Sequence, residues 1–293
     1  MKKILITGAN SYIGTSVEKY LSQWSDKYEV YTLDMKDGSW REKSFVGYDS
    51  VFHVAGIAHQ DSGKITENLK QLYYKVNTDL TIETAKKAKS EGVGQFIFMS
   101  SIIVYGASAK MGEKKVITID TVPAPVGAYG DSKLQAEKGI EPLSSDSFRV
   151  CILRPPMIYG PGCKGNYPML SKAARKLPFF PVLKNQRAML SVMNLCAFIQ
   201  QLINQSTAGI YFPQNPEYVS TSEMVRTIAK VHGKNIRMTS LFNPILRLLS
   251  GVPSIINKVF GSLVYEQILD LETQFNMPYT FDESISITEW GAA

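Results

Sequence analysis

A tyrosine and a lysine stand four positions apart in the sequence, at Tyr129 and Lys133, and good helix formers follow them. Residues at this spacing share one face of a helix. A lysine ammonium beside a phenol favours the phenolate and lowers the pKa of the tyrosine. The phenolate can then take a proton from an alcohol while a hydride leaves the same carbon. The pair therefore predicts acid–base chemistry coupled to hydride transfer.

Two serines, Ser100 and Ser101, end the apolar run that begins at Phe96. A hydroxyl at the end of a strand beside the helix of Tyr129 can hold the oxygen of a substrate. Tyr-x-x-x-Lys occurs by chance in many helices, so the prediction depends on this serine and on a dinucleotide site earlier in the chain.

The first apolar run leads directly into a glycine-containing turn, and a helical pattern follows it. Gly8 permits a sharp turn from strand to helix, and Gly14 lets the helix lie close to the sheet. Backbone N–H groups at the start of such a helix attract a pyrophosphate, although the turn departs from the usual Gly-x-Gly-x-x-Gly. The residues predicted to contact a dinucleotide are Gly8, Asn10, Ser11, Tyr12, Ile13 and Gly14.

The second apolar run ends at Leu33-Asp34, twenty residues after Gly14. A carboxylate at this position accepts hydrogen bonds from the adenosine ribose and repels a 2′-phosphate, which favours NAD over NADP. Lys36 and Arg41 are close enough in sequence to weaken that preference, so NADP is not excluded. The alternative is that Asp34 is an ordinary loop carboxylate.

Short apolar runs rich in β-branched and aromatic residues alternate with segments of helical period, which predicts a doubly wound parallel sheet of the Rossmann-like α/β class. The predicted strands are Lys3–Thr7, Tyr28–Leu33, Ser50–Val54, Gln95–Ser100 and Phe148–Leu153. The predicted helices are Ile13–Trp24, Thr66–Ser90 and Tyr129–Pro142.

The pattern changes after about residue 160, where prolines punctuate a loop-rich stretch. We expect a dinucleotide-binding domain at 1–160 and a smaller substrate lobe at 161–293, with 188–204 returning to the sheet domain. The cleft between two such domains is the expected site. Helices are predicted at Asn194–Asn204 and Ser220–His232. The apolar tail Leu241–Leu271 predicts short helices over the substrate, with an amphipathic membrane-surface segment as the alternative.

The composition is that of a soluble globular protein, with 44% hydrophobic and 20% charged residues. The net charge of +6 is spread without a long basic run, so we expect no nucleic-acid partner. Three cysteines are too few and too far apart for a disulfide framework or a metal site. The N-terminal apolar run is too short for a signal peptide, and no run is long enough to insert in a membrane, so the expected location is the cytoplasm.

These motifs resemble the extended short-chain dehydrogenase/reductases, in particular the nucleotide-sugar epimerase/dehydratase branch, and lie nearest its UDP-glucose 4-epimerases. The resemblance includes Thr7-Gly8 to Gly14, Ser101, and Tyr129 to Lys133. It continues through further stretches and covers about the first 200 residues. These stretches are Asp49–Gly56, Asn77-Thr78, Arg154–Gly162 and Arg187–Leu195.

The resemblance implies roles for individual residues. Ser101 would orient the substrate hydroxyl, and is preferred to Ser100 because the serine of the family lies four residues before a tyrosine that matches Tyr105. Tyr129 would be the acid and base, and Lys133 would hold the cofactor ribose and tune the phenol. Further cofactor contacts implied are Val54, Ala55, Gly56, Asn77 and Pro156.

The resemblance also implies substrate contacts. Arg187 would pair with the diphosphate of the substrate, and Asn166 is a candidate sugar or phosphate contact by position. His53 is expected to be a strand-end residue near the cofactor. The long helices Thr66–Ser90 and Tyr129–Pro142 could pair in a homodimer, as is common in the family.

Departures from the family pattern narrow the reaction. Ser11 stands at its middle glycine, and Asn194 at its usual aspartate, which we interpret as structural. Ile102 and Ile103 stand where 4,6-dehydratases carry an acidic pair, and two isoleucines cannot transfer a proton. The predicted activity is therefore C4 epimerisation of a nucleotide sugar, UDP-linked by resemblance. The alternatives are an NAD(P)H-dependent 4-keto-sugar reductase and a non-catalytic dinucleotide sensor.

Overall fold

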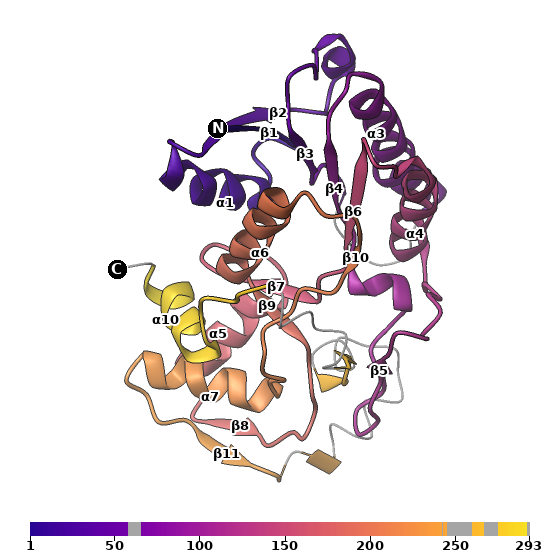
Figure 1. Cartoon of the computed structure of the whole chain (residues 1–293). Coiled ribbons are helices and arrows are strands. Elements are labelled where there is room, and N and C mark those ends of the chain that lie inside the picture. Colours follow the sequence, from indigo (N-terminus) through magenta and orange to yellow (C-terminus); the bar gives the residue numbers. More distant parts are fainter. Residues whose placement is uncertain (58–65, 242, 245–259, 267–274, 292–293) are drawn as a thin grey trace. The chain divides into compact units, whose positions relative to one another are not determined.

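The computed structural model of the chain describes residues 1–57, 66–241, 243–244, 260–266 and 275–291 (Figure 1). These residues form two compact units, each built from three stretches of the chain. The first unit contains Met1–Gly106, Val122–Pro155 and Cys196–Pro213. The second contains Ala107–Thr121, Pro156–Leu195 and the described residues from Gln214 onward.

The first unit contains a six-stranded parallel sheet in the order β10-β6-β4-β3-β1-β2. The predicted doubly wound α/β fold is confirmed, and each of its five predicted strands is present. The strands are β1 Lys2–Thr7, β2 Tyr28–Leu33, β3 Ser50–His53, β4 Gln95–Met99, β6 Arg149–Leu153 and β10 Gly209–Tyr211.

The strand register brings the candidate residues to one edge of this sheet. Thr7 of β1 pairs with Leu33 of β2 and with His53 of β3. Met99 of β4 pairs with Leu153 of β6. Because all these strands run in parallel, the residues that follow them meet at the carboxyl edge, where α/β folds bind their ligands. Those residues are Gly8, Asp34, Val54, Ser100 and Arg154.

Helices cover both faces of the sheet, with α3 and α4 on one side and α1 and α6 on the other (Figure 1). Their bounds are α1 Tyr12–Leu21, α2 Glu67–Tyr73, α3 Leu80–Ser90, α4 Ala128–Ile140 and α6 Val192–Gln205. The single helix predicted over Thr66–Ser90 contains a π-helical stretch, Tyr74–Asp79, between α2 and α3. Thr66 begins it as an N-cap, with its hydroxyl accepting from the Leu69 N–H at 3.3 Å.

The core of the first unit is formed by strand residues buried on both faces of the sheet. Val51, Phe96 and Phe98 have no exposed surface, and Leu5 is nearly as buried. Ala136 of α4 packs into the same cluster. Continuous apolar strands are typical of a parallel sheet covered by helices on both sides, which is why this fold could be predicted.

The second unit contains short strand pairs and three described helices, and the sequence predicted only one of those helices. The strand pairs are β7 Met157–Tyr159 with β9 Met189–Ser191, β8 Phe179–Pro181 with β11 Arg237–Thr239, and β5 Val116–Ile117 with β12 Val264–Tyr265. The helices are α5 Asn166–Lys176, α7 Thr221–Val231 and α10 Phe281–Trp290.

After residue 160 the sequence predicted loops. This prediction was wrong at Asn166–Lys176, which form the helix α5. Pro168 lies in the first turn of this helix, where its missing N–H has no intrahelical partner to lose. The helix predicted at 220–232 is confirmed as α7, with Ser220 as its N-cap. Most of the tail predicted at Leu241–Leu271 lies outside the described residues. Within the ranges that are described, no helix is long and apolar enough to cross a membrane.

Candidate active site

The turn after β1 requires glycine at Gly8. Its φ is +95°, and a Cβ atom there would lie 2.7 Å from the backbone nitrogen of Ala55. The Gly8 N–H donates to the Leu33 carbonyl at 2.9 Å, which closes the turn against the end of β2. The backbone of the turn can therefore approach the loop after β3 more closely than any side chain would allow.

Ser11 is the N-cap of α1. Its hydroxyl accepts from the Gly14 N–H at 3.1 Å, and a Cβ atom on Gly14 would lie 2.6 Å from this oxygen. Because the oxygen acts as an acceptor here, the hydroxyl proton of Ser11 remains able to donate to an anion. The serine at the family's middle-glycine position thus begins the helix without blocking it.

A cavity of about 410 Å³ lies at this edge of the sheet. Asp34 lines it with half of its side chain exposed, and the Lys36 ammonium lies 3.9 Å from the Asp34 carboxylate. Arg41, the other nearby cation, forms a two-pronged ion pair with Glu83 and lies over the Trp40 ring. The cavity is lined by Gly8, Ala9, Asn10, Ser11, Asp34, Met35, Lys36, Val54, Ala55, Gly56, Ile57, Val76 and Leu80.

Asn77 fixes the loop that closes this cavity. It is fully buried in the π-helical stretch, and its side-chain oxygen accepts from the Ile57 N–H at 2.8 Å. Its amide group donates to the Ile57 carbonyl at 3.2 Å and to the Ser132 hydroxyl at 3.1 Å. A Cβ atom on Gly56 would lie 3.0 Å from the Asn77 oxygen, so a larger residue there would require this amide to shift.

These residues fit a dinucleotide. One cavity contains groups for both parts of a dinucleotide. The glycine turn at the start of α1 and the Ser11 hydroxyl can bind a pyrophosphate, and the Asp34 carboxylate can bind a ribose. Tyr12 and Ile13 form the first turn of α1 beside them.

The Ser101 hydroxyl lies near enough to the Tyr129 phenol to lower its pKa. Ser101 is the N-cap of the short helix Ile102–Tyr105 and accepts from the Ile103 N–H at 3.3 Å. Burial raises the pKa of the Tyr129 phenol to about 12, the nearby Tyr73 adds to this, and the Ser101 hydroxyl opposes it. The structure therefore brings together the serine and tyrosine that the sequence singled out, with the tyrosine protonated.

Lys133 is almost completely buried. Its ammonium donates to the Met99 carbonyl at 2.9 Å and lies 4.8 Å from the centre of the Phe98 ring. Burial lowers the pKa of Lys133 to about 8, while Glu137 acts in the opposite direction. The sequence predicted that Lys133 would lower the pKa of Tyr129. In the structure burial dominates, and the ammonium contacts Met99 and Phe98 at the end of β4.

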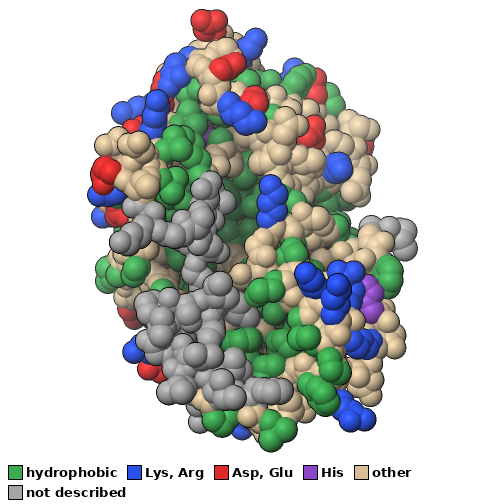
Figure 2. All heavy atoms as spheres, turned by 180° about the vertical axis from the view of Figure 1, so that it is seen from behind, with side chains coloured by type: hydrophobic (Ala, Val, Ile, Leu, Met, Phe, Trp, Pro, Cys, Tyr) green, Lys and Arg blue, Asp and Glu red, His purple; other side chains and the backbone are tan. Residues whose placement is uncertain are grey.

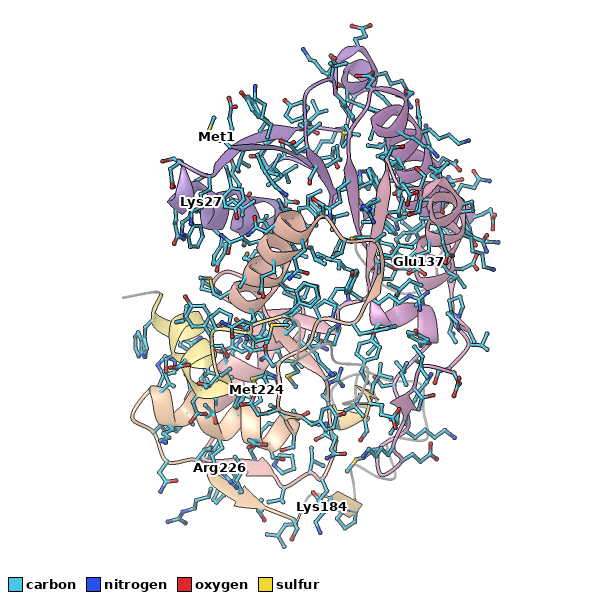
Figure 3. All side chains as sticks on the ribbon, viewed as in Figure 1. Met1, Lys27, Glu137, Lys184, Met224 and Arg226 are labelled. Atoms are coloured by element: carbon cyan, nitrogen blue, oxygen red, sulfur yellow. The ribbon has the colours of Figure 1, made fainter. Side chains whose placement is uncertain are left out.

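A buried ion pair behind these residues was missed by the sequence reasoning. The Arg154 guanidinium binds the Glu137 carboxylate at 2.6 Å and donates to the Tyr105 hydroxyl, also at 2.6 Å. Ser100 donates its hydroxyl to Glu137. Figure 3 shows Glu137 between α4 and β6. Its position four residues after Lys133 on the same helix was the signal that could have found it.

This network separates the roles of the two serines. The Ser100 hydroxyl donates to the buried carboxylate of Glu137, whereas Ser101 is partly exposed and lies near Tyr129. The network joins β4, β6, α4 and the short helix Ile102–Tyr105, so it holds the elements that carry Ser101 and Tyr129.

His53 is buried at the end of β3. Its ring nitrogens contact the hydroxyls of Thr7 at 2.7 Å and Thr81 at 3.1 Å. Burial, with a smaller contribution from the Lys133 charge, lowers the pKa of His53 to about 3. It is therefore neutral and enclosed, in agreement with the prediction that it is not a catalytic base.

The remaining predicted contacts lie in the second unit. Asn166 is the first residue of α5, Pro156 is buried, and Arg187 pairs with Val219 through the backbone. The Arg187 guanidinium donates to the Gly261 carbonyl at 3.3 Å, and burial lowers its pKa to about 10. Asn194 bonds to Asn215 at 3.0 Å and to the Tyr279 backbone, which is the structural role expected of it.

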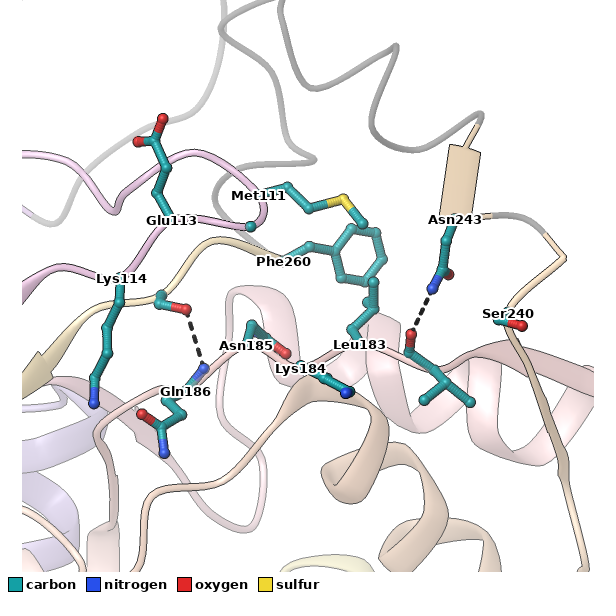
Figure 4. A pocket seen from close by; sticks show the side chains of 13 residues that line it. Met111, Glu113, Lys114, Leu183, Lys184, Asn185, Gln186, Ser240, Asn243 and Phe260 are labelled. Carbon is teal, nitrogen blue, oxygen red and sulfur yellow. Dashed lines mark hydrogen bonds between the residues drawn. The ribbon is translucent and has the colours of Figure 1, made fainter.

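A second cavity, of about 440 Å³, lies within the second unit and is lined in part by the residues that precede Arg187 (Figure 4). Lys114 and Lys184 bring two ammonium groups to it, and Glu113 brings one carboxylate. The Gln186 N–H donates to the Ser262 hydroxyl at 3.1 Å in its wall. The cavity is suited in charge to an anionic ligand with polar edges.

Comparisons with known proteins agree with this geometry. The model of the NAD dependent epimerase/dehydratase family matches residues 4–212. The UDP-glucose 4-epimerase of Vibrio cholerae is 35% identical over 249 residues, which are 78% of this chain and 75% of that protein. The N-acetyl-alpha-D-glucosaminyl-diphospho-ditrans,octacis-undecaprenol 4-epimerase of Escherichia coli O157:H7 is 25% identical over 277 residues, which are 88% and 81% of the two chains.

Solved structures share the fold at low identity. The dTDP-4-dehydrorhamnose reductase of Bacillus anthracis, solved in complex with NADP, superposes with a TM-score of 0.74. The match covers 100% of both chains with 18% identity. At this identity the likeness concerns the fold alone.

Proposed function

Because the chain belongs to the NAD-dependent epimerase/dehydratase family, we propose that it interconverts the C4 epimers of a nucleotide sugar with NAD as its cofactor. The substrate is a UDP-hexose or a UDP-N-acetylhexosamine, and the reaction passes through a 4-keto sugar. The observation that carries the proposal is the proximity of the Ser101 hydroxyl and the Tyr129 phenol at the carboxyl edge of the sheet, beside a cavity that fits a dinucleotide.

The dinucleotide would be held by the turn Gly8–Gly14, by Asp34 at its ribose, by the loop Val54–Gly56 and by Lys133. NAD bound there would supply the hydride acceptor for C4 of the sugar and the hydride donor for the return to the opposite face. Asn77 acts through the loop that it fixes. The ion pair of Arg41 with Glu83 supports the preference for NAD, because it engages a guanidinium that could otherwise bind a 2′-phosphate.

The residues of the chain move one proton. In the first half-reaction the O4 hydroxyl gives its proton to the Tyr129 oxygen while Ser101 holds O4 by a hydrogen bond. In the second half-reaction Tyr129 returns that proton to O4 of the inverted sugar. For this cycle Tyr129 must accept a proton, so the positive charge of Lys133 is needed to stabilise the phenolate against the burial that raises its pKa.

Two observations favour epimerisation over the alternatives. Both sequence relatives described above are named as 4-epimerases of diphosphate-linked sugars. Ile102 and Ile103 follow Ser101 directly, and neither can transfer the proton that a dehydratase needs. A 4-keto-sugar reductase would use the same catalytic residues and differs in consuming NAD(P)H once per turnover.

For the nucleotide end we propose the cavity that contains Lys114 and Lys184, with Arg187 pairing with the diphosphate and Asn166 contacting sugar or phosphate. We further propose that the enzyme acts in the cytoplasm, which the three free and buried cysteines support. The homodimer stays a prediction.

The test is NMR of UDP-glucose and of UDP-N-acetylglucosamine, each incubated with purified protein and no added cofactor. The expected result is the galacto isomer from at least one of them, with NAD retained by the protein. In deuterated water the C4 hydrogen is expected to stay protium, because the hydride returns directly. The variant Tyr129→Phe should bind NAD and leave both sugars unchanged.

Other outcomes would count against epimerisation. No conversion of either sugar, together with oxidation of NADPH by a 4-keto nucleotide sugar, would identify a reductase. Bound NAD with neither reaction would favour the dinucleotide sensor.

A further inference from the structure

The positive charge of the chain is concentrated in one stretch. Residues 164–265 contain 12 Lys or Arg and only 2 Asp or Glu. The rest of the chain contains 20 Lys or Arg and 24 Asp or Glu. The net charge of +6 therefore arises entirely from this stretch. The chain has no long basic run, but its charge is unevenly distributed along the sequence.

Six of these cations are exposed on neighbouring elements of the second unit, and we call them the basic face. α5 and α7 pack against each other through their buried sides and turn their charged sides outward. Within the part of the chain that the structure describes, none of the six pairs with a carboxylate. The basic face consists of Lys172, Arg175, Lys176, Arg226, Lys230 and Arg237.

Contacts between elements show that these residues adjoin one another. Lys234, just after α7, donates its ammonium to the carbonyls of Arg175 at 2.9 Å and Leu177 at 3.0 Å. Arg237 of β11 is the register partner of Phe179 in β8. Partners in a parallel pair point to the same side of the sheet, so Arg237 and Phe179 are exposed together. Arg226 extends from α7 in Figure 3.

Large apolar side chains are exposed among these cations. Leu177 is 44% exposed, Phe179 is 45% and Met169 of α5 is 46%. Trp290 of α10 is 67% exposed, and its indole N–H donates to the Val231 carbonyl at the end of α7. Figure 2 shows a face of the molecule on which Lys and Arg gather with hydrophobic side chains between them.

We propose that the basic face, together with Leu177, Phe179 and Trp290, docks the protein on an anionic phospholipid surface. Unpaired cations are attracted to anionic headgroups, and exposed leucine, phenylalanine and tryptophan enter the boundary between headgroups and acyl chains. A nucleic acid would use the cations but would gain little from an exposed leucine, which is why a lipid surface fits better. This inference does not depend on the catalytic proposal.

The test uses the purified full chain with vesicles of phosphatidylcholine that contain phosphatidylglycerol. The protein should float with these vesicles at low salt, dissociate as salt is raised, and stay behind with pure phosphatidylcholine. Tryptophan emission should shift to the blue on binding. Trp290→Phe should abolish most of that shift, because Trp40 is buried already and the partly buried Trp24 belongs to the first unit, outside the basic face.

Charge reversal should distinguish binding through the basic face from attraction of the vesicles to the net charge of the whole protein. A contact of one Lys or Arg with an anionic leaflet is worth roughly fivefold in affinity, so Lys172→Glu with Lys176→Glu should weaken binding roughly 25-fold or more. The matched control is Lys86→Glu with Lys138→Glu, which changes net charge equally on exposed helix positions of the first unit. Leu177→Ser with Phe179→Ser should weaken binding at constant charge.

The proposal would be overturned by equal binding to pure phosphatidylcholine, by no binding to the anionic vesicles, or by an equal loss in both double charge reversals. It would also be overturned if duplex DNA displaced the vesicles while the serine variants bound them as the unaltered chain does. All variants are compared after their thermal unfolding confirms an intact fold.

Discussion

The hydroxyl of Ser101 lies near the phenol of Tyr129, while that of its neighbour Ser100 donates to the buried carboxylate of Glu137. The two adjacent serines therefore differ in environment: Ser101 is accessible to a substrate, and Ser100 is buried in the protein. The choice between the two serines, which the sequence made only by resemblance, has a physical basis in these partners.

Substitution of the two serines should separate catalysis from stability. We expect Ser101→Ala to lower kcat about 10²-fold to 10³-fold with little effect on unfolding, since it removes a hydrogen bond to the reacting oxygen. Ser100→Ala should lower the free energy of unfolding by about 1.5–3 kcal/mol, because it removes a bond to a buried charge. Steady-state epimerisation rates and urea denaturation measure both. Equal losses of kcat would contradict the assignment.

Removal of one charge from the buried pair should destabilise the first unit. Glu137→Gln leaves the Arg154 guanidinium without its anionic partner, and we expect a loss of about 3–5 kcal/mol in urea denaturation. The control is Glu83→Gln, which breaks the exposed pair with Arg41 and should cost no more than about 1 kcal/mol. A similar small loss in both variants would show that the buried pair is not holding the site elements.

His53 should make the chain less stable in acid. Its pKa is about 3 in the folded chain, against 6.5 for an ordinary histidine, so the unfolded chain binds the proton more readily. The stability that neutral His53 provides is therefore complete above pH 6.5 and is lost as pH falls toward 3, at about 1.4 kcal/mol per pH unit. The variant His53→Gln should flatten this dependence. Parallel curves for the two proteins would contradict it.

Gly8→Ala should weaken NAD binding by more than backbone strain explains. The new Cβ would lie 2.7 Å from the Ala55 nitrogen, so the turn and the loop after β3 must move apart. Gly47→Ala is a matched control, because Gly47 has φ +85° and no atom within 4 Å of the added carbon. We expect at least a tenfold rise in Kd for NAD in the first variant, measured by calorimetry, and an unchanged Kd in the second.

The sheet and its ligand edge could be predicted because apolar strand runs, glycine turns and cap residues act locally. The π-helical stretch, α5 and the identity of Arg154 as the partner of Glu137 could not, since each depends on residues distant in sequence. Only the spacing of Glu137 from Lys133 on one helix indicated a carboxylate near the site. The pKa of Tyr129 was predicted in the wrong direction for the same reason: the spacing to Lys133 indicates a neighbour, but the extent of burial is a property of the whole unit. The clustering of cations likewise emerges only when α5, α7 and β11 are placed together.

The π-helical stretch Tyr74–Asp79 sets the direction in which the Asn77 side chain leaves the helix, and so affects the cofactor site. Each residue of a helix turns the chain by about 100°, so one residue more or fewer between Thr66 and Asn77 would swing the Asn77 amide to another side. The loop at Ile57 would then lose both of its bonds to that amide while every side chain in the cavity stayed the same. Relatives could therefore differ in cofactor affinity through a single insertion or deletion far along the helix, with no change in any residue that touches the ligand.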